Sequence, residues 1–338
     1  MVDLTICTNI IPLDKKNIEL NWDLTTRLNT SDGWRWIVTV DNNETEGRAV
    51  EKVTQLGDKR CELVEVYDEE IKQASVWGAN YHHGAALNKI LNRIKSRYVL
   101  FIDPDFYIIR QQWMEEILSY MQENQLAFFG VPWHPKWYMK YRYFPCIHCL
   151  FIDLKKIPLH SLNLLPDVPD QITKKPSSWK ETKSRVRPYL PTFARDSFQF
   201  FKWAVLNRRT ICKEWDTGSR IYLRYRGFPE HRFEYVTPVF RPQEEFIGPN
   251  GVFFAFNRVI EKILPDQYCY IPKRKESFTS KGFKDAQYPD VSQWAWEEFM
   301  WKEKPFGFHV RRYPKRNENL VEHDNLLPSV LEQCAQNL

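Results

Sequence analysis

Asp103 and Asp105 are two carboxylates separated by one proline, and they directly follow the apolar run YVLFI at 98–102. Five consecutive apolar residues rich in β-formers are typical of a strand buried on both faces. Pro104 cannot donate to a strand ladder, so we expect the strand to stop there. Two acids at the carboxyl end of a central strand can hold one hard cation, Mg²⁺ or Mn²⁺, with positions left for substrate phosphates. A solvated loop after a strand is the alternative that this short motif leaves open.

The first 125 residues alternate between strand and helix patterns. Predicted strands cover 4–7, 34–40, 61–66 and 98–102, and predicted helices cover 14–28, 44–56, 81–94 and 110–123. Strands that alternate with amphipathic helices indicate a doubly wound sheet, largely parallel, with helices on both faces. The fold class predicted for the chain is therefore α/β.

The pattern loosens after residue 125. Strands are predicted at 127–131, 147–152 and 232–239, helices at 195–206 and 293–301, and a long irregular connection at 158–192.

Composition limits the class of protein. The chain has 338 residues, 15% aromatic residues and a formal net charge of +5. This charge suits a phosphate-bearing ligand or an anionic surface and is too small to indicate nucleic acid. The first ten residues lack a signal-peptide pattern, and no run reaches the roughly 18 apolar residues of a spanning helix, so we expect a cytoplasmic protein. Seven scattered cysteines offer one C-x-x-C pair, Cys146 and Cys149, which we interpret as reduced core thiols because a zinc site needs two more ligands.

Several motifs occur in the order seen in one enzyme family. The chain opens with LTICTNI, its second predicted strand ends at Asp41, and a helix start reads NYHHGAALN from Asn80 to Asn88. D-P-D follows, then WDTGSR from 215 and KPFGFHVRR at 304–312. Together these resemble a nucleotide-sugar-dependent glycosyltransferase of the GT-A fold, closest to family 2. The resemblance implies a GT-A, mostly parallel mixed sheet, with a nucleotide-sugar-binding half at 1–125 and an acceptor-binding and catalytic half at 126–338.

The resemblance also implies roles for individual residues. Asp103, Asp105 and the late His309 are the implied metal ligands, for Mn²⁺ or Mg²⁺. The implied nucleotide-sugar contacts are Thr8, Asn9, Asp41, Gly84, Asn88, Lys89, Asp103, Arg311 and Arg312. Asp216 is the implied general base, since Arg224 and Gly227 follow it at the family's spacing. Trp215 stands where the family has Glu, and Asp196 is the rival base.

An aromatic and basic segment at 133–144 follows the strand predicted after the metal site. The GT-A fold receives its acceptor on that side, so Trp133, Trp137 and Tyr141 are the expected acceptor contacts, with a glycan or lipid-linked acceptor and peripheral membrane contact as expectations. A surface loop that covers the core is the other interpretation. A nucleotidyltransferase or a DxD metal-dependent phosphatase remains an alternative, because either would use the same acid pair.

Overall fold

The computed structural model describes residues 3–11, 14–42, 58–67, 79–137, 140–167, 216–227, 232–242, 259, 261–262, 266, 269, 271–310 and 320–337. Within these ranges the chain forms two sheets. Their strands are β1 (Leu4–Ile10), β2 (Trp34–Asn42), β3 (Cys61–Tyr67), β4 (Tyr98–Ile102), β5 (Phe106–Ile108), β6 (Phe128–Pro132), β7 (Pro145–Asp153), β8 (Phe233–Tyr235), β9 (Thr237–Pro238), β10 (Glu297–Trp301) and β11 (Lys304–His309).

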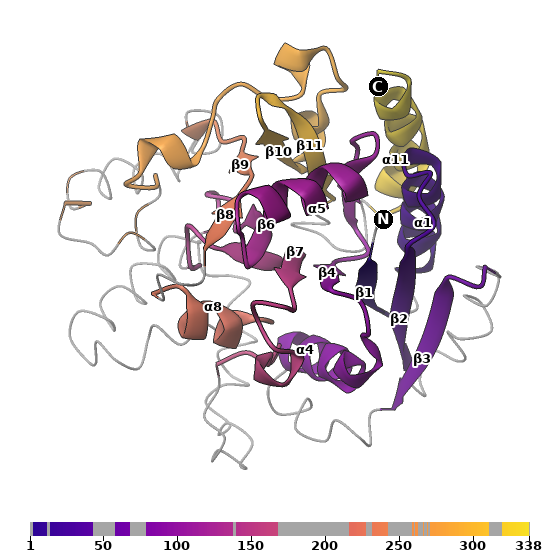
Figure 1. Cartoon of the computed structure of the whole chain (residues 1–338). Coiled ribbons are helices and arrows are strands. Elements are labelled where there is room, and N and C mark those ends of the chain that lie inside the picture. The colour runs from indigo at the N-terminus through magenta and orange to yellow at the C-terminus, as the bar shows by residue number, and fades with distance from the viewer. Residues whose placement is uncertain are drawn as a thin grey trace, which may run out of the picture.

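The larger sheet is mixed and mostly parallel, with the strand order β3-β2-β1-β4-β7-β6-β8 (Figure 1). β3, β2, β1 and β4 run parallel, and so do β6 and β8. β7 is antiparallel to both of its neighbours, β4 and β6. Every residue of β1, β4 and β7 is buried, as expected for central strands covered on both faces. The predicted α/β fold class is confirmed.

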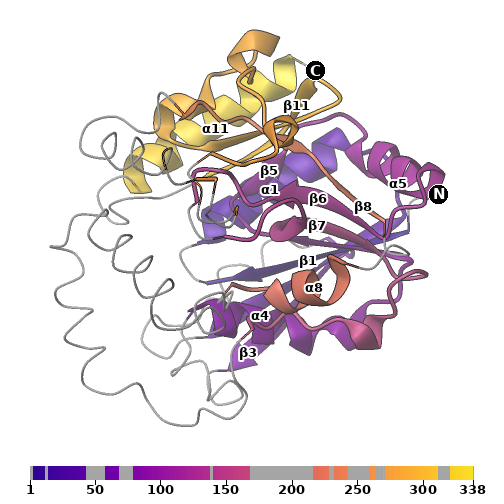
Figure 2. The ribbon, with the colours of Figure 1, turned by 90° about the vertical axis from the view of Figure 1, so that its left-hand side faces the viewer.

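Helices cover both faces of this sheet. They are α1 (Lys15–Leu28), α4 (Ala79–Lys89), α5 (Trp113–Glu123), α8 (Ser219–Tyr225) and α11 (Leu320–Gln336). Figures 1 and 2 show α1, α5 and the smaller sheet on one side and α4 and α8 on the other. The C-terminal helix α11 lies beside α1, far from it in sequence, and the two are joined by an ion pair between Arg27 and Glu332.

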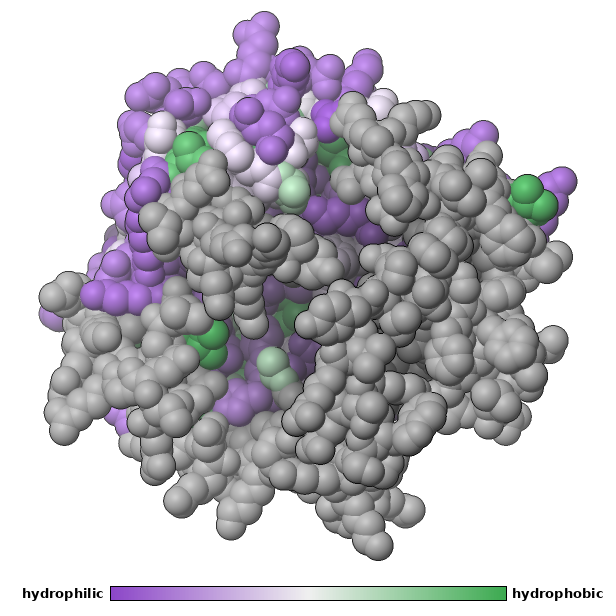
Figure 3. Space-filling view, turned by 180° about the vertical axis from the view of Figure 1, so that it is seen from behind, coloured by the Kyte–Doolittle hydropathy of each residue, from purple (hydrophilic) through white to green (hydrophobic). Residues whose placement is uncertain are grey.

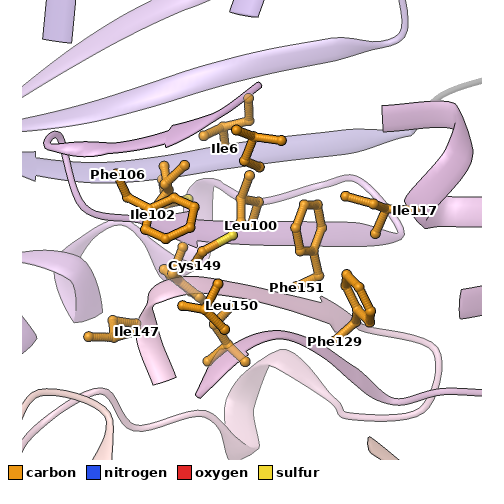
Figure 4. Close-up of a cluster of buried hydrophobic side chains, with 14 of the residues drawn as sticks. Ile6, Leu100, Ile102, Phe106, Ile117, Phe129, Ile147, Cys149, Leu150 and Phe151 are labelled. Atoms are coloured by element: carbon orange, nitrogen blue, oxygen red, sulfur yellow. The ribbon is translucent and has the colours of Figure 1, made fainter. Parts of the chain in front are cut away.

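The core between the sheet and α5 is aromatic. Leu100, Phe129, Phe151 and Ile117 come from β4, β6, β7 and α5, and Figure 4 shows their side chains gathered over the same stretch of sheet. Trp113 packs edge-on against Phe151 at a centroid distance of 5.9 Å. Edge-on ring pairs of this kind fill a core, and this one packs α5 against β7.

The smaller sheet has the order β5-β11-β10-β9 and is antiparallel throughout. β4 ends at Ile102 and β5 begins at Phe106, so residues 103–105 form the turn that carries the chain from one sheet to the other. The Phe106 N–H donates to the Asp103 carbonyl at 3.1 Å and closes this turn. The acid pair therefore lies where the two sheets meet.

Most of the predicted elements are present, with shifted ends. The predicted strand at 98–102 coincides with β4, and those at 127–131 and 147–152 become β6 and β7. The predicted strand at 232–239 divides into β8 and β9, which belong to different sheets.

The helix predicted at 293–301 is wrong. Val291–Trp294 is a short 3₁₀ helix, and Glu297–Trp301 is strand β10 between β9 and β11. The sequence EEFMW has no strong preference of its own, so pairing on both sides decided its structure. The predicted helices at 44–56 and 195–206 lie outside the described residues.

The described surface is mostly hydrophilic on the side opposite to that of Figure 1, with hydrophobic residues scattered singly (Figure 3). Leu223 and Val259 are the large hydrophobic side chains most exposed among the described residues. In the described part of the chain, no helix has both the length and the apolar character to cross a bilayer.

Gly307 provides a test of how the smaller sheet is packed. A Cβ at this position would lie 2.4 Å from the Tyr107 carbonyl oxygen of the paired strand β5. Gly307→Ala should therefore lower the free energy of unfolding by about 1–3 kcal/mol, measured by urea denaturation. Gly227→Ala is the matched control, because nothing lies within 4 Å of its added Cβ. Equal stabilities of the two variants would contradict the packing described here.

Candidate functional site

Asp103 is held against strand β7 by its backbone and by its side chain. Because β7 pairs antiparallel with β4, Cys149 faces Ile102 and the next pair is His148 with Asp103. The Asp103 N–H donates to the His148 carbonyl at 3.1 Å. The carboxylate Oδ2 lies 2.5 Å from His148 Nδ1. The strand register therefore places a buried imidazole on the first acid of the pair.

A second imidazole reaches the acids from the smaller sheet. His309, the last residue of β11, has its Nε2 3.0 Å from Asp105 Oδ1 and 3.8 Å from Asp103 Oδ2. The rings of His148 and His309 lie 4.6 Å apart between centroids. One ligand atom from each of Asp103, His148 and His309 falls within 4.8 Å of the others. Such a set of carboxylate oxygens and imidazole nitrogens is able to bind a divalent cation.

Electrostatics keep Asp103 ionised. Burial alone would raise the pKa of this carboxyl, but the charge and hydrogen bond of His148 outweigh burial, with His83 and His309 adding to them, and the pKa lies well below its usual range. His83 Nε2 is 3.9 Å from Asp103 Oδ1. Burial lowers the pKa of His83 more than the nearby acids raise it. The site thus combines a fixed anion with an imidazole biased toward its neutral form.

The turn that carries the acids is held from both sides. Asn21 of α1 donates to the Phe106 carbonyl at 2.7 Å and to the Pro104 carbonyl at 3.4 Å. On the other side, the Val310 N–H donates to the Asp105 carbonyl at 2.9 Å. Because Asn21 is 2% exposed, its bonds are shielded from water and the turn has little freedom.

His148 is the site residue that sequence reasoning missed. It lies within the strand predicted at 147–152, between Cys146 and Cys149 of the C-x-x-C pair. The signal was one ionisable residue inside the run CIHCLFI, at a position that is 7% exposed here. Buried ionisable groups need partners, so such a residue in a central strand is a candidate for a site. Cys146 and Cys149 are both buried in the same strand, and burial raises the pKa of Cys149 well above its usual value.

The structure places the first predicted nucleotide contacts at the carboxyl ends of neighbouring strands. Thr8 and Asn9 end β1, and Asp41 lies near the end of β2, so they share an edge of the sheet with Asp103. The Thr8 hydroxyl accepts from the indole N–H of Trp36 at 2.9 Å, and Asn9 Oδ1 accepts from Thr39 at 2.7 Å. Hydrogen bonds to β2 therefore fix the side chains of Thr8 and Asn9 near the predicted donor edge.

The predicted contacts on α4 are tied to other parts of the protein. A Cβ on Gly84 would lie 2.5 Å from the Leu164 carbonyl, so glycine permits close packing there. Asn88 Nδ2 donates to the Asn163 side chain at 3.2 Å, and its Oδ1 accepts from the Leu164 N–H at 2.9 Å. Lys89 Nζ donates to the Glu65 carbonyl at 3.0 Å. The roles of all three toward a nucleotide remain predictions.

Asp216 is buried just before α8, at 6% exposure. Its carboxylate bonds to the Lys140 ammonium and accepts from Asn80 Nδ2 at 3.2 Å. Lys140 Nζ also lies 4.4 Å from the centre of the Trp133 ring, and that ring packs edge-on against His148 at 4.4 Å. The side chains of Lys140 and Trp133 therefore link Asp216 to His148 through a continuous series of contacts. The rival base Asp196 lies outside the described residues, as do Arg311 and Arg312.

The three predicted acceptor contacts are mostly turned inward. Trp133 is 9% exposed and Tyr141 is 2% exposed. Tyr141 stacks on Tyr222 at 4.2 Å. Trp137 is half-buried, and its indole N–H donates to Glu297 of β10. Acceptor contact remains a prediction, and Trp137 is the most accessible of the three.

Comparisons with known proteins agree with the resemblance in the sequence. Residues 37–195 match the family model described as Glycosyl transferase family 2. The structure is similar to that of TarS 1–349 from S. aureus, with 11% identity and a TM-score of 0.35 over 51% of this chain and 52% of that one. It is similar to the mannosyltransferase PcManGT from Pyrobaculum calidifontis in complex with GDP-Man and Mn²⁺, with 14% identity and a TM-score of 0.35 over 49% of this chain and 48% of that one. The chain thus spans about half the length of these structures. No protein with curated annotation matches the sequence.

The low pKa of Asp103 predicts how acid acts on the protein. A carboxyl whose folded pKa lies below its ordinary value of 3.8 contributes stability above that value and loses it as the pH falls toward the folded pKa. In the presence of a chelator, the free energy of unfolding of the wild type should therefore fall steeply below pH 3.8. In His148→Ala this fall should be shallower, because burial then raises the pKa of Asp103 again. Urea denaturation between pH 6 and pH 3 measures both slopes, and equal slopes would contradict the assignment.

Proposed function

We propose that the chain is a glycosyltransferase that transfers a sugar from a nucleoside-diphosphate sugar to a hydroxyl group with the help of a divalent cation, and the match of residues 37–195 to the family 2 model supports sugar transfer. The observation that carries this proposal is the buried cluster of Asp103, Asp105, His148 and His309 at the carboxyl edge of the sheet. Open α/β sheets bind their ligands at that edge. The nucleotidyltransferase and phosphatase alternatives would use the same acids, and the family match favours sugar transfer.

The residues present fit a cation. Asp103 is partly buried and ionised, and two imidazoles face it, so the cluster combines negative charge with nitrogen donors. Mg²⁺ prefers oxygen ligands alone, whereas Mn²⁺ and other transition-metal ions accept imidazole as well. We therefore expect Mn²⁺ to be preferred over Mg²⁺. When bound, such a cation supplies positive charge against the diphosphate of the donor and of the departing nucleotide.

Residues of this chain would bind the rest of the donor. The position of Asp41 at the end of β2, next to Thr8 and Asn9 at the end of β1, supports contact with the nucleoside. Arg311 and Arg312 follow His309 within three residues, which supports a role in neutralising the leaving diphosphate by charge-assisted hydrogen bonds.

Asp216 is our candidate for the general base of an inverting reaction. A base must accept the proton of the acceptor hydroxyl as the bond to the sugar forms. Asp216 forms an ion pair with Lys140, which holds the carboxylate in one position just before α8. Lys140 belongs to the same segment as Trp137 and Tyr141, so an acceptor that contacts this segment would lie near Asp216. The acceptor is proposed to be a glycan or a lipid-linked sugar, with peripheral membrane contact in the second case.

The basic residues of that segment bear on the choice of acceptor. Lys136 lies 3.6 Å from Glu297, Lys140 bonds to Asp216, and Arg142 lies 3.6 Å from Asp266. Each positive charge already has an acidic partner within the protein. Attraction of an anionic acceptor by these three residues is thus weak, and contact through aromatic faces is the better-supported mode.

Donor binding should depend on the cation and on Asp105. Calorimetric titration of the wild type with UDP or GDP should show binding in Mn²⁺ that is at least about tenfold weaker with chelator, and Asp105→Ala should lose the difference. Asp23→Ala, which removes an exposed carboxylate of α1, is the control. Release of nucleoside diphosphate from a panel of sugar nucleotides then tests transfer itself. Equal nucleotide affinity with and without Mn²⁺ would contradict the proposed role of the cluster.

The choice between Asp216 and Asp196 can be made with two matched variants. Asp216→Asn keeps the size of the side chain and removes its charge, so transfer should fall by roughly 10² or more while donor affinity holds. Asp196→Asn should have a much smaller effect on transfer. The opposite result would make Asp196 the base, and no effect of either would rule out a carboxylate base from these two positions.

A further inference from the structure

His309 has a second acidic neighbour on the side away from the acid pair. In the smaller sheet Glu297 of β10 is the residue directly opposite His309 of β11. Glu297 Oε2 lies 3.4 Å from His309 Nδ1, while the other ring nitrogen, Nε2, faces Asp105 at 3.0 Å. Both residues are 1% exposed. A shift of roughly 0.5 Å would close the Glu297–His309 separation to a hydrogen bond.

The other oxygen of Glu297 is bound by the aromatic and basic segment at 133–144. Oε1 accepts the indole N–H of Trp137 and lies 3.6 Å from the ammonium of Lys136. Lys136 Nζ also donates to the Ala295 carbonyl at 3.0 Å, two residues before Glu297. An ionised carboxylate at this depth needs such partners, because an uncompensated buried charge is strongly destabilising. The carboxylate of Glu297 is therefore positioned by Trp137 and Lys136 at Oε1 and by His309 at Oε2.

We infer that Glu297 is a positioning residue for the cation site, and that it couples Trp137 and Lys136 to His309. By accepting from Nδ1–H, Glu297 holds the tautomer of His309 in which Nε2 has a lone pair for a cation. Carboxylates that orient ligating histidines in this way contribute strongly to metal affinity. The inference rests on the proposed function, since it takes the cluster around Asp103 to be a cation site.

The coupling has a direct consequence for the segment that is proposed to meet the acceptor. Trp137 is half-buried, so one part of its ring is accessible while its N–H is bound to Glu297. Any contact that turns this indole loosens Glu297 and hence His309. The affinity for the cation and the position of Trp137 are therefore linked, and by thermodynamic necessity the linkage acts in both directions.

The neighbouring residue Glu298 provides an unusually close control. It lies on the same strand, is 2% exposed, and faces the opposite side of the sheet, where it accepts from the Phe283 N–H at 3.0 Å and lies 3.9 Å from Arg241. Successive residues of a strand point to opposite faces, so Glu298 has no contact with His309. The change from Glu to Gln at either position replaces one buried carboxyl group of β10 by an amide of the same size.

The test is the affinity of the resting protein for Mn²⁺ alone, measured by electron paramagnetic resonance without nucleotide. Glu297→Gln should weaken Mn²⁺ binding about tenfold, and Glu298→Gln should leave it unchanged even where it lowers stability. Unchanged affinity in Glu297→Gln, or an equal loss in Glu298→Gln, would overturn the inference. Since no donor is present, this titration can fail or succeed independently of sugar transfer, which the nucleotide-release assay tests by itself.

A second variant addresses the coupling and covers a Glu297→Gln protein that does not fold. Trp137→Phe keeps an aromatic ring and removes only the N–H bond to Glu297, so it should weaken Mn²⁺ binding roughly threefold. Trp294→Phe, the same change at a tryptophan that packs against Trp296, should have no effect. In protein labelled with ¹⁵N at its eight histidines, the Zn²⁺-loaded wild type should show a protonated Nδ1 for His309. Loss of that signature in Trp137→Phe supports the coupling, and wild-type affinity in Trp137→Phe contradicts it.

Discussion

The arrangement of this protein depends on one partly buried, ionised carboxylate. Asp103 sits at the end of the central strand β4 with its side chain 14% exposed, and burial by itself opposes its charge. The charge persists because His148, His83 and His309 face it from three different elements. Removal of such partners leaves an uncompensated charge, which costs far more than an ordinary surface ion pair contributes. The elements that carry these histidines, β7, β11 and α4, must therefore place the imidazoles close to Asp103.

Two sheets satisfy that requirement by meeting at one turn. β7 brings His148 to Asp103 through the larger sheet, and β11 brings His309 to Asp105 through the smaller one. The three residues between β4 and β5 belong to neither sheet and are fixed from outside by Asn21. Asp105 and His309, more than 200 positions apart in sequence, thus share one site, and the division of roles at residue 125 describes proposed function only.

The segment at 133–144 has a different character from the one its composition indicates. Its basic side chains neutralise buried acids, and three of its aromatic side chains, those of Trp133, Tyr141 and Phe144, pack inside. Through Lys136 and Trp137 it meets Glu297, and through Lys140 it meets Asp216. It therefore joins the proposed base to the proposed cation site, whose acid pair lies more than a hundred residues before Asp216 in the chain. The positive charges of Lys136 and Lys140, which the sequence suggested for binding an acceptor, are thus paired with acidic residues of the protein itself.

The sequence by itself determined the features that depend on local pattern. The run YVLFI and the proline after it sufficed to place β4 and its end, and alternation of strands and helices sufficed for the α/β class. The order of motifs indicated a glycosyltransferase and named Asp103, Asp105 and His309 as candidates. Only the tertiary structure decided that EEFMW is a strand, that His148 faces Asp103, and that Glu297 stands behind His309. Those three facts follow from the register between strands distant in sequence, and a periodic pattern carries no record of which strand pairs with which.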